Sequence, residues 1–238
     1  MTDPLPSSAR YAIGPNPPAL DPALRDTLGA CETTMLGHIL YWGAIDPSLR
    51  PNAGFAPRTV GRALTVQCPG PCSTILHHAI CFAAPGDILV IDRLGDTRYA
   101  CLGDGVAAAA VRQGIVGAVI DGPCADTVEL AEMDFPVWCR GVSPVTTRLA
   151  NLGGRAQVPV SCGGVAVCPG DAVLADSDGV FVLGRAEASE VAETALRRGQ
   201  IVAERRLNRT EAKPLGQIAG ASALVEADLR MPPPAHSA

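Results

Sequence analysis

Two short loops of this sequence contain residues whose types and spacing could do chemistry. Residues 95–105 read GDTRYACLGDG and residues 121–126 read DGPCAD, and each loop follows an apolar run and precedes a helical pattern. In a parallel α/β fold such loops meet at the carboxyl edge of the sheet, where these folds bind ligands. The pattern therefore brings Asp104 and Asp126 to one edge.

The first loop favours an anion and the second a cation. Gly103, Asp104, Gly105 and Val106 begin an alanine-rich helix, where free backbone amides and the helix dipole attract a carboxylate or phosphate. The two glycines have no Cβ, so a ligand could approach closely. Asp126 could bind a hard divalent cation directly or through water. Each aspartate is also a good helix N-cap, so it is their pairing on adjacent strand ends that indicates a site.

The elements around these loops alternate between strands and helices, which is typical of a parallel sheet. Strands are predicted over 61–68, 86–92, 117–122 and 135–141, and helices over 23–43, 73–83, 105–114 and 126–133. Between 155 and 183, short β segments separated by CGG, PGD and DSDG turns indicate antiparallel hairpins. A helix with a break near Gly199 is predicted over 186–207.

Length and composition predict one α/β domain. The chain has 238 residues, of which 47% are hydrophobic and 4% aromatic, so its core is aliphatic. We expect an extended arm rich in Pro and Ser over 1–22, the domain over 23–210, and a partly disordered tail over 211–238.

Charge and hydropathy argue against several classes of partner. The net charge is -5 and no basic block could neutralise phosphates, which argues against nucleic acid and anionic membranes. The arginines near the C-terminus alternate with glutamates and indicate a solvated helix face; they are Arg197, Arg198, Arg205, Arg206 and Arg209. The N-terminal pattern is not that of a signal peptide and no apolar run approaches about 18 residues, which predicts a cytoplasmic protein.

The nine cysteines are scattered, and in the cytoplasm they would be reduced. Cys68 and Cys72 are the closest pair, but no further ligands for zinc lie nearby, so we expect them to pack in the core. Cys124 precedes a helix that could lower its pKa and make it a nucleophile. The sequence places no histidine to activate it, since His77 and His78 lie on the preceding helix.

Several motifs in one order make the sequence similar to the RraA-like family, over about residues 25–205. They are PGDILVID, the GD and LGD of the first loop, GAVIDGPCAD, FPVWCRG, GGVAVCPGD and ADSDGVFVL. The family includes class II 4-hydroxy-4-methyl-2-oxoglutarate and 4-carboxy-4-hydroxy-2-oxoadipate aldolases, as well as regulators of ribonuclease E. The resemblance implies a single-domain α/β/β/α sandwich related to swivelling phosphohistidine domains. It also implies homotrimers or homohexamers with sites at subunit interfaces.

The resemblance further implies a set of ligands for a small carboxylate substrate. In the aldolases, backbone amides before the alanine-rich helix hold the carboxylate of the pyruvate unit; here these would belong to Gly103, Asp104, Gly105 and Val106. An aspartate of the second loop supports a Mg²⁺ or Mn²⁺ ion, and it maps onto Asp126. The metal acts as a Lewis acid that stabilises the enolate formed when a C–C bond breaks.

Two positions depart from the family pattern. The second loop of the family reads DG-x-x-R-D, and Ala125 replaces its arginine, which contacts the pyruvyl oxygens; Gly37 lies about where an early aspartate is usual. Losing one such preorganised donor costs about 10²–10³ in rate. Arg98, on the loop that faces the same site, is the nearest substitute by sequence, and Arg93 and Arg140 are further candidates. Alternatively, the substrate differs or catalysis is lost.

These observations predict a divalent-metal-dependent lyase of the aldolase or decarboxylase type, acting on a 2-oxo acid or a related oxygenated carboxylic acid. Asp126 would anchor the metal, and Asp104 would position a water or the substrate hydroxyl for proton transfer. Two alternatives stay open. One is a divergent tailoring enzyme of specialised metabolism on the same scaffold, and the other is a non-catalytic, RraA-like regulator that binds a protein.

Overall fold

The computed structural model describes residues 10–207 and 214–229. They fall into two compact units, one ending at Gly199 and the other beginning at Gln200. The second unit contains the end of α7 (Ala188–Leu207) together with α8 (Leu215–Ala219) and α9 (Ala221–Leu229). Within the described ranges, no helix combines the length and the hydropathy that crossing a bilayer requires.

A nine-stranded sheet, counted over the described residues, forms the centre of the first unit. Its middle consists of four parallel neighbours: β3 (Thr59–Gln67), β4 (Asp87–Asp92), β5 (Gly117–Cys124) and β6 (Val137–Val142). The outer strands are β1 (Tyr11–Ile13), β2 (Arg50–Pro51), β7 (Gly154–Ala156), β10 (Ala172–Ala175) and β11 (Val180–Leu183). β10 pairs antiparallel with the first half of β3, and β7 with its end, so β3 joins the parallel and antiparallel parts.

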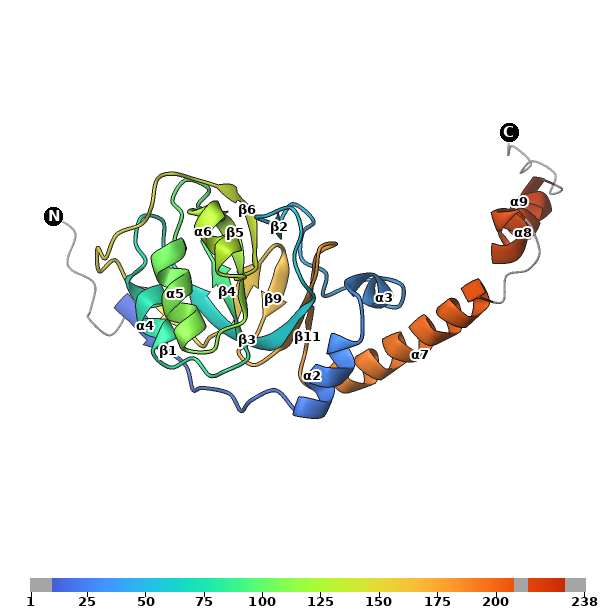
Figure 1. Ribbon diagram of the computed structural model, residues 1–238, viewed down its shortest axis with the longest axis horizontal. Helices are drawn as coiled ribbons and strands as arrows, with labels where there is room; N and C mark the ends of the chain where they lie inside the picture. The colour runs from blue at the N-terminus through green and yellow to red at the C-terminus, as the bar shows by residue number, and fades with distance from the viewer. Residues whose placement is uncertain (1–9, 208–213, 230–238) are drawn as a thin grey trace, which may run out of the picture. The chain divides into compact units, whose positions relative to one another are not determined.

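Helices and a hairpin cover the two faces of this sheet (Figure 1). One face is covered by α4 (Thr74–Ile80), α5 (Asp104–Arg112) and α6 (Thr127–Glu132). The other face packs on the hairpin of β8 (Val160–Cys162) and β9 (Val165–Val167). Beyond β10 and β11 lie α2 (Pro22–Gly29), α3 (Thr33–Gly37) and the beginning of α7. The resulting order of layers is α/β/β/α, and the predicted α/β class is confirmed.

The sequence of β4, DILVID, shows why this strand lies in the middle. All six residues are buried, as in a parallel strand covered on both faces. Leu89 and Ile91 pack in the core against α4, α5 and α6, while Ile88 and Val90 pack in the core against the hairpin. The alternation of side chains along a strand thus supplies two cores from one apolar run.

The expected elements are present, with two differences. The helical segment predicted over 23–43 is two short helices, because buried Asp176 accepts hydrogen bonds from the Thr33 amide (2.8 Å) and hydroxyl (2.6 Å) and starts a second helix there. The break predicted near Gly199 is absent, and α7 continues through this residue. Residues 1–9 of the predicted arm, 208–210 of the predicted domain, and 211–213 and 230–238 of the predicted tail lie outside the described residues.

A buried ion pair between β3 and β4 generates a stability prediction. Arg62 Nε and Nη2 lie 2.7 and 2.8 Å from the two carboxylate oxygens of Asp87, with side chains 4% and 1% exposed. Asp87→Ala would leave the guanidinium buried without a counter-charge, so we expect a loss of about 3–5 kcal/mol in the free energy of unfolding, measured by urea denaturation. Asp26→Ala, which breaks the exposed pair with Arg25, should cost less than about 1 kcal/mol. Equal losses in the two variants would contradict this assignment.

Candidate functional site

The loops that follow β4 and β5 meet at the carboxyl edge of the sheet, as the sequence predicts. The Ala125 amide donates a hydrogen bond to the Leu102 carbonyl (3.0 Å), which joins the second loop to the end of the first. This bond places the beginning of α5 beside the beginning of α6. The residues of both loops therefore face one shared space.

The side chain of Asp126 bonds to the neighbouring helix rather than to its own. It precedes α6 in the left-handed conformation (φ 55°), and its side chain makes no cap bond to α6. Its Oδ2 instead accepts from the Asp104 amide (3.0 Å), at the first residue of α5. The carboxylate thus lies at the positive end of the α5 dipole, which stabilises its charge. Asp104 Oδ1 accepts from the Gly105 amide (2.5 Å).

Gly103 makes this arrangement sterically possible. A Cβ at this position would lie 2.1 Å from Asp126 Oδ2 and 3.1 Å from its carboxyl carbon. The backbone of Gly103 is extended (φ -140°), so the requirement for glycine comes from the close approach of the carboxylate and not from strain.

A cavity of about 320 Å³ opens between α4, α5, Asp126 and the 146–149 segment. It is lined by Ser73, His77, Ala100, Cys101, Gly103, Asp104, Gly105, Val106, Asp126, Thr146, Thr147, Arg148 and Leu149. Both predicted aspartates and the predicted amide-bearing residues at the beginning of α5 therefore share one cavity. The hydroxyl-bearing residues, His77 and Arg148 were not assigned to the site from the sequence.

The arginines proposed from the sequence do not line this cavity. Arg98 is exposed, and its guanidinium lies 5.6 Å from the ring centroid of Tyr99. Arg93 is fully buried and donates to three backbone carbonyl groups. Arg140 forms an ion pair with Asp121. Each side chain thus has a partner elsewhere.

Arg148 is the arginine that lines the cavity. Its amide donates to the Pro71 carbonyl (2.9 Å), and its carbonyl accepts from the Ser73 amide (3.1 Å), so its backbone is fixed to the residues before α4. The side chain is exposed, and no hydrogen bond or ion pair to another described residue engages its guanidinium. No local pattern in TTRLA could have placed it here, because both bonds join residues more than 70 positions apart.

Cys124 and Gly37 are not part of the cavity wall. Cys124 is buried with its sulfur 3.5 Å from that of Cys139, and this contact and burial raise the pKa of the Cys124 thiol. A neutral thiol in the core is a poor nucleophile, which argues against the covalent role considered above. Gly37 ends α3, whose Leu36 packs with Phe181 of β11.

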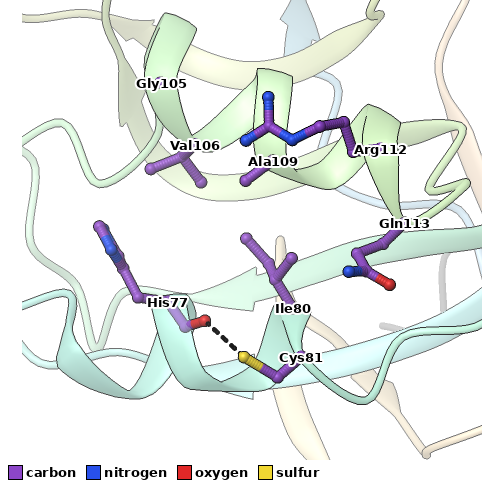
Figure 2. Close-up of a pocket in the computed structure, with 8 residues that line it drawn as sticks. All are labelled: His77, Ile80, Cys81, Gly105, Val106, Ala109, Arg112 and Gln113. Atoms are coloured by element: carbon purple, nitrogen blue, oxygen red, sulfur yellow. Dashed lines mark hydrogen bonds between the residues drawn. The ribbon is translucent and has the colours of Figure 1, made fainter.

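A second hollow continues from the cavity between α4 and α5 (Figure 2). Its volume is about 230 Å³, and it shares His77, Gly105 and Val106 with the first cavity. Figure 2 shows the His77 ring rising from α4 toward Val106 at the beginning of α5, with Arg112 at the other end. His77 thus lies where the two hollows join.

Comparisons with known proteins point to one family. A family model described as RraA-like, Aldolase/RraA, matches residues 35–182. A Halalkalibacterium halodurans protein, named provisionally as a 4-hydroxy-4-methyl-2-oxoglutarate aldolase, is 37% identical over 138 residues, 58% of this chain and 65% of that protein. A Halorhodospira halophila protein with the same provisional name is 41% identical over 137 residues, 54% of this chain and 83% of its own length. The chain thus spans just under two thirds of the first relative.

Solved structures extend the likeness. RraAS2 of Streptomyces coelicolor, described as an unusual member of the RNase ES inhibitor RraA protein family, has a TM-score of 0.69 at 29% identity, covering 82% of this chain and 100% of its own. The RNA-processing inhibitor RraA from Thermus thermophilis has a TM-score of 0.57 at 28% identity, covering 63% of this chain and 90% of its own. The relatives thus include proteins named as lyases and proteins named as inhibitors of RNA processing.

The contact between Gly103 and Asp126 generates a prediction about binding. Gly103→Ala would force the carboxylate away from the Asp104 amide, because the new Cβ would overlap Oδ2. We expect this variant to fold but to lose most of its affinity for a divalent cation and oxalate together, measured by calorimetry. Gly29→Ala, in α2 and outside the cavity, is the matched control, because a Cβ at that position meets nothing within 4 Å. Equal affinity in both variants would refute the steric argument.

Proposed function

This chain belongs to the RraA-like family, and from that premise we propose that it is a divalent-metal-dependent lyase that breaks or forms a C–C bond next to a 2-oxo acid. The observation that supports this most is the cavity itself. The amides of Asp104 and Gly105 already donate to the Asp126 and Asp104 carboxylates, which leaves the Gly103 and Val106 amides for a substrate carboxylate, and Asp126 and Arg148 line the same cavity. The provisional names of the two bacterial relatives support the same reaction class.

The charge of the cavity supports a cation bound with the substrate. Two carboxylates, Asp104 and Asp126, and one guanidinium, Arg148, leave this space negative when all three are ionised. A carboxylate substrate would be repelled there unless a cation were bound beside it. The same substrate would be attracted once a divalent ion offsets the two aspartates.

The carboxylate oxygens of the cavity are better suited to Mg²⁺ or Mn²⁺ than to a metal ion whose ligands all come from the protein. Asp126 Oδ1 and Asp104 Oδ2 are hard oxygen donors that make no hydrogen bond to another described residue, while the other oxygen of each carboxylate accepts a hydrogen bond from a backbone amide. Among the described residues, no group of three or more His, Cys, Asp or Glu side chains could hold a metal. Mg²⁺ is commonly bound by one or two carboxylates, with water and substrate completing its shell. When bound, such an ion supplies Lewis-acid stabilisation of the negative charge that develops on the 2-oxo acid.

We propose that Arg148 supplies the positive charge that the family arginine provides at the position of Ala125. Ala125 is 6% exposed and lies beside Gly103, on the loop of Asp126. Arg148 lines the same cavity from the 146–149 segment, with its backbone fixed at both its amide and its carbonyl. A preorganised positive charge is most effective close to the atom on which negative charge develops in the transition state. A guanidinium on a different wall of the cavity can stabilise the same enolate oxygen.

Assembly and location stay predictions from the sequence. We expect a homotrimer or homohexamer, in which a neighbouring subunit adds residues to the open side of the cavity, and a cytoplasmic protein. A tailoring enzyme on this scaffold would use the same metal and amide wall with a different substrate. A protein-binding regulator would have no need of either.

The Asp126 carboxylate provides the first test of this proposal. Calorimetry with Mg²⁺ or Mn²⁺ and oxalate, a pyruvate-like dianion, should show oxalate binding that requires the metal and is lost in Asp126→Ala. Glu132→Gln, an exposed change at the end of α6, should bind as the wild type does. Metal-independent binding, or no binding by the wild type, would sink the lyase proposal and favour the regulator.

Arg148 provides a second test, measured as kcat/KM in a screen of aldol and decarboxylation substrates. Arg148→Ala should lower kcat/KM by about 10²–10³, as expected for one lost preorganised donor. The double variant Arg148→Ala, Ala125→Arg should recover part of this loss, because it returns a guanidinium to the cavity. An Arg148→Ala protein with wild-type kcat/KM would show that Arg148 does not act in the reaction.

A further inference from the structure

We propose that His77 is the catalytic residue that moves the proton at the reacting carbon of the substrate. This inference rests on the proposed lyase function and adds to it a proton donor and acceptor. Breaking a C–C bond beside a 2-oxo group leaves an enolate, and the reaction is complete only when its C3 carbon receives a proton. His77 is the one imidazole among the described residues that line the cavity.

The fold presents His77 to the cavity through the amphipathic pattern of α4. Ile75, Leu76, Ala79 and Ile80 of this helix are buried against the sheet, so His77 projects from its exposed side. That side faces the beginning of α5, and the ring rises toward Val106 (Figure 2). The imidazole therefore borders the amides and carboxylates at which the 2-oxo acid would bind.

The other titratable groups of the cavity are less suited to this step. Asp126 and Asp104 each accept a backbone amide, and in the proposed function they also face the metal. The Arg148 guanidinium does not release a proton in proteins. Burial raises the pKa of Cys101 to about 11, which keeps its thiol protonated at neutral pH. An imidazole, by contrast, can donate a proton from one ring nitrogen and accept one at the other.

Charged groups of both signs surround the His77 ring. Asp104 and Asp126 share the first cavity with it, together with the Arg148 guanidinium. Arg112 of α5 shares the second hollow, and Cys81, which follows α4, donates to the backbone carbonyl of His77 (3.8 Å) and not to its ring. No hydrogen bond or ion pair to another described residue engages the ring nitrogens, so they are available to a ligand.

The proposed step balances without any redox partner. After C–C cleavage the electron pair remains on the enolate of the 2-oxo acid. The imidazolium N–H bond of His77 breaks, its proton bonds to C3, and the enolate electrons form this C–H bond as the C2 carbonyl is restored. In an aldol cleavage, His77 obtains this proton beforehand from the substrate hydroxyl, whose O–H electrons form the carbonyl of the departing fragment as the C–C bond breaks. In a decarboxylation, the neutral His77 regains a proton from water after the step.

His78 offers a matched control on the same helix. It is exposed like its neighbour, but its ring packs edge-on against Phe82 with centroids 5.7 Å apart, and it lines neither hollow. A His78→Gln variant therefore carries the same chemical change one residue away from the proposed site.

The test follows exchange of the pyruvate methyl protons in D₂O by ¹H NMR, with Mg²⁺ or Mn²⁺ present. By microscopic reversibility, neutral His77 should remove a C3 proton and return a deuteron. We expect His77→Gln to slow exchange by about 10²-fold or more, the usual contribution of a general acid–base. Metal-dependent oxalate binding should be retained. His78→Gln should exchange at the wild-type rate, and added imidazole should partly restore exchange to His77→Ala.

The outcomes separate this inference from the proposed function. Wild-type protein that does not bind oxalate with metal would overturn both. Wild-type protein that binds oxalate but exchanges no protons would overturn the role of His77 while leaving the metal pocket intact. Proton exchange at the wild-type rate in His77→Gln would also overturn the role of His77. A His77→Gln protein that loses both oxalate binding and proton exchange would overturn it too, because His77 would then act in binding. Slow exchange with intact binding supports it.

Discussion

The hydrogen bond from the first amide of α5 to the Asp126 carboxylate is the constraint on which the candidate site depends. It needs a residue without a Cβ at 103, because the carboxylate oxygen occupies the space that a side chain would fill. It also needs Asp126 in the left-handed conformation, which aspartate tolerates better than most residues. Together these conditions fix a negative charge at the positive end of a helix and leave a second oxygen free for a ligand.

The parallel sheet supplies the geometry for that bond. β4 and β5 lie side by side in register, so the loops that leave them start at the same edge. The bond between the Ala125 amide and the Leu102 carbonyl then holds the loops together over the last few residues. On this side of the site, the buried strand DILVID and the bond between the Ala125 amide and the Leu102 carbonyl hold the beginning of α5 in place. Between them, the Asp92 and Asp96 carboxylates accept hydrogen bonds from backbone amides of the loop.

This half of the site could be predicted from the sequence, because its signals are local. The apolar runs identify the strands, the glycines and the alanine-rich stretch identify the beginning of α5, and the two aspartates follow adjacent strands. The other half could not. Arg148 reaches the cavity through backbone bonds to Pro71 and Ser73, which no pattern in its own segment reveals. The periodicity of α4 places His77 on the exposed side but does not say what it faces, and Arg98 was favoured only because it is near in sequence.

The loop that carries Asp126 and the segment that carries Arg148 are held in place by different backbone contacts. This difference is relevant to the replacement of the family arginine by Ala125. An arginine at position 125 would lie on the same loop as Asp126, so that one loop would position both the positive charge and the carboxylate proposed to bind the metal. Arg148 instead shares its support with α4, since its amide and carbonyl bond to the two residues that flank Cys72 just before that helix. The Arg148 backbone is therefore held by the segment that leads into α4, which carries His77, and not by the loop of Asp126. In the proposed function, the positive charge and the proton donor therefore reach the substrate from the 146–149 segment and α4, and the Asp126 carboxylate reaches it from the loop after β5.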